Sequence, residues 1–191
     1  GTDRAGNASS FELGIVYFDD LPPQITGAFP ISNSFINLDE VEYSVNEQLL
    51  NGDIKWTPTD GTSLINVLLS GVELDQGDFL RSKLTNQKDL VDGTIYDLII
   101  SANDRAGNSS NITLAENITF DKTKPKFTQV TPTTSARINS QLIKWTVDEE
   151  LKSGKYTWIY MGGSDDPEAP HTFDLTQDIL KKGSFDNSIL G

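Results

Sequence analysis

The feature that most constrains the fold of this chain is an internal repeat. Asp3–Ser9 reads DRAGNAS, and Asp104–Ser110 reads DRAGNSS, 101 positions further on. Five more pairs of identical residues lie 102 positions apart: Asp19 and Asp121, Ile36 and Ile138, Glu47 and Glu149, Gly52 and Gly154, and Trp56 and Trp158. Dispersed identities at nearly one spacing are typical of tandem structural units. The chain is therefore predicted to be part of a repeat array.

The repeat sets the predicted boundaries of the units. Residues 19–120 are predicted to form a complete unit, and residues 1–18 to be the last strand of a preceding one. Residues 121–191 are predicted to form a second unit that lacks its C-terminal strands. Each boundary has an acidic residue followed by proline, in DDLPP (19–23) and in DKTKP (121–125). Proline fixes φ and keeps the preceding residue extended, so each connector is expected to be stiff.

The second unit has no counterpart of residues 89–120, which include the penultimate strand of the first unit. Loss of that strand would expose the core and two strand edges. We expect either the continuation of a longer chain or another chain to fill the gap, and residues 1–18 could contribute by β-augmentation. The continuation is favoured, because residues 1–18 hold no equivalent of the strand around Tyr96.

Alternation of apolar and polar residues indicates strands along the whole chain. Val41, Tyr43 and Val45, for example, alternate with polar residues, as expected for a half-buried strand. The apolar run 63–69 is more continuous, which is consistent with a strand covered on both faces. Short runs of this kind, separated by turns that contain glycine, predict an all-β fold of antiparallel sandwiches.

Tyr96 gives a more specific indication. It opens the penultimate strand of the complete unit, directly after the turn Asp92–Thr94, and shares one face with Leu98 and Ile100. A tyrosine at this place is typical of the tyrosine corner of immunoglobulin-like sandwiches, in which the phenol bonds back to the backbone. The alternative is an ordinary core tyrosine.

Three segments give the chain a resemblance to a known family. They read TIYDLIISANDRAGNSS (94–110), ITFDKTKP (118–125) and IKWTVDEELKSG (143–154). Together they resemble the bacterial immunoglobulin-like repeats of large surface adhesins and gliding-associated filaments. The resemblance implies tandem immunoglobulin-like or fibronectin-III-like β-sandwiches in a secreted protein of the bacterial cell surface. It also implies a structural stalk or filament segment that supports cell adhesion or gliding motility. Such a segment contacts neighbouring repeats of its own chain and reaches a cell-surface or polysaccharide target through other domains.

The same resemblance implies Ca²⁺ as a possible cofactor at the unit junctions, because calcium prefers carboxylate, amide and carbonyl oxygens. The candidate ligands are Asp104, Asn108, Asp121, Asp19 and Asp20. Glu47 and Glu149 are expected near one end of each sandwich. The alternative is that Asp104 and Asn108 only make Asx-turn hydrogen bonds to the backbone, and that Asp121 faces water.

Composition disfavours several classes of function. The 191 residues include 28 acidic and 15 basic side chains, a net charge of −13, which argues against nucleic acid and against an anionic membrane surface as partners. The chain has no cysteine and one histidine, so neither a disulfide framework nor an ordinary zinc site is expected. It has no run of eighteen apolar residues, so this segment is not expected to insert into a membrane.

Enzyme activity is not expected. His171, the one possible base of a serine triad, lies in an acidic insertion (162–171) that reads as a solvated loop and that only the second unit has. The rival function is a carbohydrate-binding β-sandwich module of a secreted protein. Exposure of Trp56 and Trp158 along one face would favour sugar binding, whereas their burial would favour a spacer.

Overall fold

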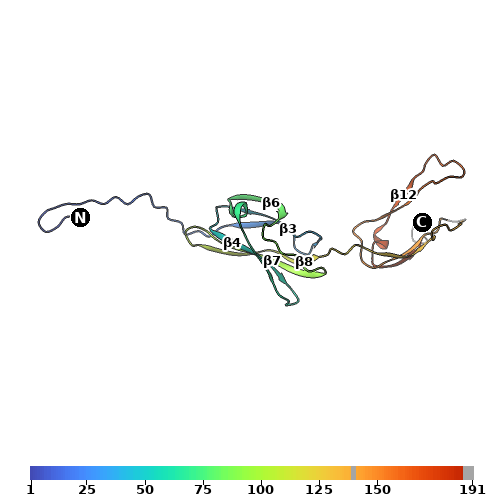
Figure 1. Cartoon of the computed structure of the whole chain (residues 1–191), viewed down its shortest axis with the longest axis horizontal. Coiled ribbons are helices and arrows are strands. Elements are labelled where there is room, and N and C mark those ends of the chain that lie inside the picture. Colours follow the sequence, from blue (N-terminus) through green and yellow to red (C-terminus); the bar gives the residue numbers. More distant parts are fainter. Residues whose placement is uncertain (139–140, 187–191) are drawn as a thin grey trace. The chain divides into compact units, whose positions relative to one another are not determined.

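The computed structural model describes residues 1–138 and 141–186 (Figure 1). The chain divides into unit 1, residues 1–122, and unit 2, residues 123–191, and each is described by itself. The predicted second repeat, 121–191, therefore includes positions that lie outside the described residues. Strands dominate the regular structure, and helices in the described part are limited to two short 3-10 turns. The all-β prediction is confirmed.

Unit 1 contains two sheets. Its strands are β1 (Ile25–Phe29), β2 (Phe35–Ile36), β3 (Glu40–Val45), β4 (Asn51–Pro58), β5 (Ile65–Leu68), β6 (Gly77–Lys83), β7 (Thr94–Asn103) and β8 (Ser109–Phe120), with the 3-10 turn η1 (Gly71–Leu74) before β6. One sheet has the order β1-β3-β6 and the other the order β2-β8-β7-β4-β5. All pairs are antiparallel except β2 with β8, which is parallel.

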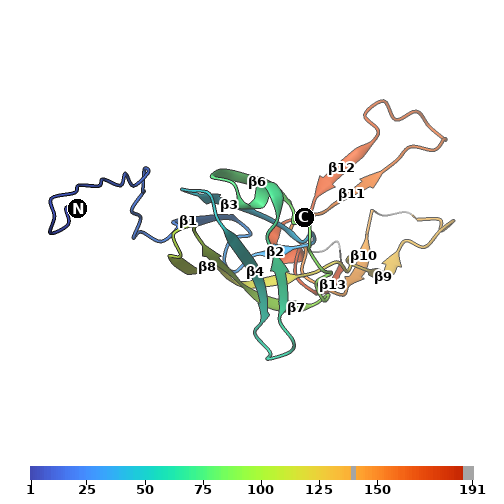
Figure 2. The same cartoon turned by 60° about the vertical axis from the view of Figure 1, so that its left-hand side comes forward.

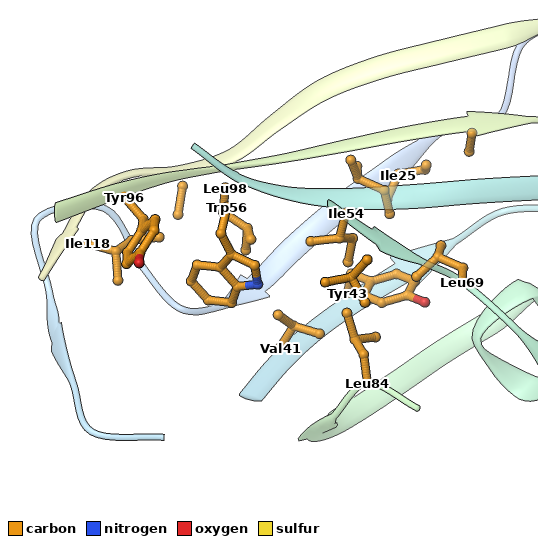
Figure 3. Close-up of a cluster of buried hydrophobic side chains, with 14 of the residues drawn as sticks. Ile25, Val41, Tyr43, Ile54, Trp56, Leu69, Leu84, Tyr96, Leu98 and Ile118 are labelled. Carbon is orange, nitrogen blue, oxygen red and sulfur yellow. The ribbon is translucent and has the colours of Figure 1, made fainter. Parts of the chain in front are cut away.

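The core of unit 1 lies between these two sheets. Along β3 and β4 every second side chain is buried, as the alternation in the sequence predicts. Val41 and Tyr43 of β3 and Trp56 of β4 point into the same space, which Leu98 of β7 also enters (Figure 3). All four side chains are at most 1% exposed. Unit 1 is therefore a sandwich-like body with a continuous core.

Tyr96 makes the backbone contact that its position in the sequence predicts. Its hydroxyl oxygen accepts a hydrogen bond from the Val91 N–H at 3.0 Å, five residues upstream. The ring is buried and packs edge-to-face on Trp56, with 6.0 Å between the ring centroids. The phenol therefore joins the turn before β7 to the middle of the core.

Glu73 is a buried carboxylate that the sequence analysis did not single out. It lies in η1, is 1% exposed, and accepts hydrogen bonds from the N–H groups of Ser70 (2.7 Å) and Thr85 (2.5 Å). Its backbone carbonyl accepts a bond from the Tyr43 hydroxyl at 2.7 Å. Burial, together with the charge of Glu73, raises the pKa of Tyr43 far above its usual range. The tyrosine is therefore a neutral donor that ties η1 to β3.

The expectation of a strand covered on both faces at 63–69 is wrong. The strand there, β5, lies at the edge of the five-stranded sheet. Val67 is 1% exposed, whereas its neighbour Leu68 is 63% exposed. An edge strand that packs on the core with one face leaves alternate side chains in solvent, whatever their polarity.

Unit 2 contains one three-stranded and one two-stranded sheet in its described part. Its strands are β9 (Phe127–Thr131), β10 (Lys144–Val147), β11 (Lys155–Trp158), β12 (His171–Asp174) and β13 (Gly183–Asp186), with the 3-10 turn η2 (Gln177–Ile179) before β13. The sheet orders are β13-β10-β9 and β11-β12, and the β11–β12 hairpin is visible in Figure 2. The small core consists of Trp145, Val147, Leu151 and Ile179 with their partly buried neighbours.

Hydrogen bonds recur at matching places in the two units. The Leu49 N–H donates to the Leu74 carbonyl (2.9 Å) in unit 1, as the Leu151 N–H donates to the Leu180 carbonyl (2.6 Å) in unit 2. The Leu69 N–H donates to the Gly52 carbonyl (2.9 Å), as the Leu175 N–H donates to the Gly154 carbonyl (2.8 Å). The Gln24 N–H donates to Asn46 Oδ1, as the Lys126 N–H donates to Asp148 Oδ1 (2.8 Å each). Strand registers agree too: Val45 pairs with Ile25 and Gly77, and Val147 pairs with Phe127 and Gly183. Strands β9 to β13 thus pair with one another in the pattern of β1, β3, β4, β5 and β6.

Residues 1–18 contain no named strand, and only Thr2 and Ala8 form an isolated bridge. The apolar side chains of residues 11–18 are exposed, from 79% for Leu13 to 88% for Phe18. That this segment is the last strand of a preceding repeat remains a prediction.

Replacement of Tyr96 by phenylalanine tests the Tyr96–Val91 contact. The change removes the acceptor and leaves the Val91 N–H without its partner, so unit 1 should lose about 1 kcal/mol of unfolding free energy. Tyr17→Phe is the matched control, because Tyr17 is 88% exposed. The measurement is urea unfolding of the full chain followed by fluorescence. Equal stability of the two variants would contradict this role of the phenol.

Candidate functional site

The turn between β7 and β8 is built around the Asp104 carboxylate. Its Oδ1 accepts hydrogen bonds from the N–H groups of Gly107 (2.7 Å) and Asn108 (2.9 Å). Its Oδ2 accepts one from the Asn108 amide, Nδ2, at 2.8 Å. Gly107 has a φ of 100°, which favours glycine at this position. The Asx-turn bonds that the sequence analysis offered as the alternative reading are thus present.

The same turn forms at the N-terminal copy of the sequence. Asp3 Oδ1 accepts bonds from the N–H groups of Ala5 (2.9 Å) and Asn7 (2.8 Å), and Asp3 Oδ2 accepts one from Asn7 Nδ2 (2.8 Å). These residues are all exposed, so no core holds them in place. The local sequence is therefore sufficient to specify this turn geometry.

The turn at Asp104 has two further acids close to it, which the copy at Asp3 does not have. The carboxylates of Asp19, Glu47 and Asp104 have oxygens within 4.8 Å of one another, which makes them the one group of this kind in the described residues. Asp104 is buried at 1% exposure, Glu47 is half-buried and Asp19 is exposed. We call these three residues the acidic cluster.

Polar contacts hold the connector of unit 1 against this turn. Asn108 Nδ2 donates to the backbone carbonyl of Asp19 at 3.2 Å, and the Ser110 hydroxyl donates to the carbonyl of Pro23. Gln24 N–H donates to Asn46 Oδ1 in the turn that also contains Glu47. The acidic cluster thus joins a connector and two turns, which are separate parts of the chain.

The three like charges affect one another. Burial raises the pKa of Glu47, and the negative charges of Asp19 and Asp104 raise it further. Burial would also raise the pKa of Asp104, but the hydrogen bonds from Asn108 and the turn N–H groups outweigh it, so the Asp104 pKa is lowered. Asp104 is therefore ionised at neutral pH, and a cation between these carboxylates would relieve their repulsion.

The structure brings together only some of the residues predicted to bind calcium. Asp19, Asp104 and Asn108 lie together, whereas Asp20 is exposed and is not one of the acidic cluster. Asp121 follows β8, which begins near Asp104 and runs for twelve residues, so Asp121 lies at the other end of unit 1. Its N–H donates to the Ile36 carbonyl at 2.9 Å.

Two details separate the acidic cluster from a finished calcium site. Asn108 turns its amide nitrogen, and not its oxygen, toward Asp104 and Asp19. If each of the three carboxylates binds through one oxygen, they supply fewer than the six to eight oxygens that calcium takes, so water, backbone carbonyls or a rotated Asn108 amide would complete the shell. Glu47 was not among the predicted ligands, although its identity with Glu149 at the repeat spacing was a signal for it.

The remaining polar candidates do not form a comparable group. In the insertion of unit 2, His171 Nε2 lies 2.9 Å from Asp166 Oδ2, and the Tyr160 hydroxyl donates to the Gly163 carbonyl at 3.0 Å. These contacts lie within one hairpin loop and are partly exposed. Both are explained as local bonds that order the loop.

Comparison of the chain with models of protein families, with curated proteins and with solved structures gives no match. Within the described residues, neither 3-10 turn nor any other helical segment has the length and apolar character needed to cross a membrane.

Glu47→Gln tests the like-charge repulsion in the acidic cluster. Because the folded-state pKa of Glu47 is raised, its ionised form costs stability at neutral pH, and the cost disappears as pH falls through that pKa. In EDTA at pH 7 the variant should be more stable by on the order of 0.5 kcal/mol, the usual scale for a like-charge contact. The gain should vanish in acid, as measured by thermal unfolding across pH.

Glu42→Gln is the control for this experiment, because it removes one charge from β3 and leaves the acidic cluster intact. A pH-independent effect of Glu47→Gln, or an equal effect of both variants, would mean that the cluster charges do not interact as described.

Proposed function

We propose that the chain is a structural segment of an extracellular stalk or filament, built from tandem immunoglobulin-like sandwiches. The observation that carries the proposal is the recurrence of three hydrogen bonds at matching places in units 1 and 2. Two bodies that repeat one pattern along a chain are suited to spanning distance. The sequence resemblance to bacterial surface adhesins and gliding-associated filaments supports the same function and a location at the cell surface.

The proposed mechanism is mechanical. Each unit has its own cluster of buried side chains, and the cluster of unit 1 is the larger of the two. Proline-containing connectors at 19–23 and 121–125 limit bending between successive units. On this proposal the repeats are 19–120 and 121–191, residues 1–18 end a preceding repeat, and an adhesive target is contacted by other domains.

Calcium at the acidic cluster would stiffen the connector. Asp19 belongs to the connector, whereas Glu47 and Asp104 belong to two turns of the sandwich. A cation held by all three would fix the connector on the sandwich and restrict its direction. Extracellular modules bind calcium with dissociation constants of about 10⁻⁴–10⁻³ M, which suits an incomplete, partly exposed site.

A carbohydrate-binding module is the alternative, and aromatic burial disfavours it. Trp56, one of its two expected platform residues, is fully buried in the core of unit 1. Trp158 is half-buried on β11. The two rings therefore offer no pair of exposed platforms, and the spacer is the better supported function.

Calcium addition and chelation test the proposed junction site. With about 10 mM calcium in place of EDTA, unit 1 should gain about 1.4–2.7 kcal/mol of unfolding free energy. Scattering from the same samples should show a less flexible chain with calcium. In Glu47→Gln the calcium effect should be largely lost, since one of three carboxylates is gone.

Asp20→Asn is the matched control for the calcium experiment. It removes an exposed acid next to Asp19 that is not one of the acidic cluster, so its calcium response should equal that of the wild type. A wild-type chain that neither melts higher nor scatters differently with calcium would rule out the junction site.

A further inference from the structure

Unit 2 has an open apolar groove. Its volume is about 450 Å³, and its lining includes Phe127, Val130, Ile143, Trp145, Tyr156 and Leu175. Phe127 and Val130 are 47% and 48% exposed. No described segment of unit 2 covers these side chains.

The matching positions of unit 1 are covered. Ile25 is the first residue of β1 and pairs with Val45, and Phe127 is likewise the first residue of β9 and pairs with Val147. Ile25 is only 5% exposed, whereas Phe127 is 47% exposed. The cover in unit 1 comes from β7 and β8: Leu98 is fully buried in the same cluster as Ile25. The groove of unit 2 therefore lies at the place that unit 1 covers with its own strands β7 and β8.

The groove lies beside a strand edge that has no partner among the described residues. In that part of unit 2, strand β11 pairs with β12 on one side only, whereas in unit 1 strand β4 pairs with both β5 and β7. The Leu175 N–H donates to the Gly154 carbonyl, and bonding pairs alternate along an antiparallel ladder. The backbone groups of Lys155 and Thr157 therefore point away from β12, toward the open edge. An extended chain can add there by β-augmentation.

Residues 11–18 have the composition that this edge and groove require. The segment reads FELGIVYF, and Phe11, Leu13, Ile15 and Tyr17 fall on one face of an extended chain, each 79–88% exposed. The two aromatic rings alone would bury roughly 300–500 Å². With Leu13 and Ile15 added, the buried surface approaches the roughly 800 Å² per partner of a specific interface.

Charge directs this segment to unit 2. Residues 1–122 carry a net charge of −12, whereas residues 123–191 carry eight basic and nine acidic side chains, a net charge of −1. Contact of the acidic N-terminal part with a second unit 1 would be strongly repulsive, whereas unit 2 is nearly neutral and adds little repulsion. The segment contains the negatively charged Glu12 and is followed by Asp19, whereas β11 carries the positively charged Lys155.

We propose that residues 11–18 of one copy of the chain add as an antiparallel strand to β11 of a second copy and fill the groove of its unit 2. The proposal rests on this segment and this groove and not on the stalk function, and in it residues 11–18 are a donor strand for another copy in place of the last strand of a preceding repeat. Because the donating and accepting surfaces differ, every copy can both give and receive, and association continues into linear oligomers.

Analytical ultracentrifugation of the full chain tests the proposal. The wild type should form larger species as concentration rises. The double variant Leu13→Asp/Ile15→Asp should weaken self-association by about tenfold or more, as for loss of an interface hot spot. These positions are exposed, so neither unit should lose stability. Thr157→Pro should act likewise from the accepting side, because it removes an outward N–H. Val72→Asp, at a 71% exposed position of unit 1, should associate like the wild type.

Cross-linking identifies the contact itself. Because the chain has no cysteine, only the introduced cysteines can react. Gly14→Cys mixed with Thr157→Cys should give a heterodimer with a short bis-maleimide, and adding Leu13→Asp to the Gly14→Cys chain should abolish it. Asp60→Cys, in an exposed turn of unit 1, should give none with Thr157→Cys. A wild type that stays monomeric, oligomers insensitive to Leu13→Asp/Ile15→Asp, or cross-linking no greater than with Asp60→Cys would each overturn the proposal.

Discussion

The pairing of β7 with β4 on one side and β8 on the other is the interaction on which unit 1 depends. It places Leu98 and Ile100 opposite Trp56 and Ile54, and all four side chains are fully buried. It also positions Tyr96, whose hydroxyl accepts from the backbone that leads into β7. The turn from β7 to β8 then brings Asp104 to the edge of the sandwich. Core and candidate site therefore share one structural origin, and unit 2, whose β11 pairs only with β12 in the described part, has a smaller core and an open groove.

The acidic cluster combines a locally specified turn with groups that only the tertiary fold supplies. The Asp–Asn turn has the same hydrogen bonds at Asp3, where its residues are exposed, and at Asp104, where the carboxylate is buried. Burial and two neighbouring acids are what distinguish the second case. A connector fixed to its sandwich by such a cluster can change in stiffness with cation concentration and with pH, while the core beneath it stays the same.

Part of this could be predicted from the sequence. Alternating residues such as Val41, Tyr43 and Val45 predicted the strands, and the position of Tyr96 predicted its backbone bond, because these features depend on near neighbours in the chain. The parallel pairing of β2 with β8 and the edge position of β5 depend on distant segments, and the alternation did not reveal them. Asp121 was grouped with Asp104 through the family resemblance, yet the twelve residues of β8 separate the two. The buried Glu73 is one of three acids in residues 70–78, and the Ser70-x-x-Glu73 spacing of a capping box was the sequence signal that could have distinguished it.

Amide hydrogen exchange at matching positions of the two units tests the central claim, that one structural pattern occurs twice. The relevant amides are those of Leu49 and Leu69 in unit 1 and of Leu151 and Leu175 in unit 2, which donate the recurring backbone bonds. If the pattern occurs twice, all four amides are protected from exchange, and the protection is weaker in unit 2 because its groove is open. Protected Leu49 and Leu69 beside Leu151 and Leu175 that exchange as in an unfolded chain would contradict it.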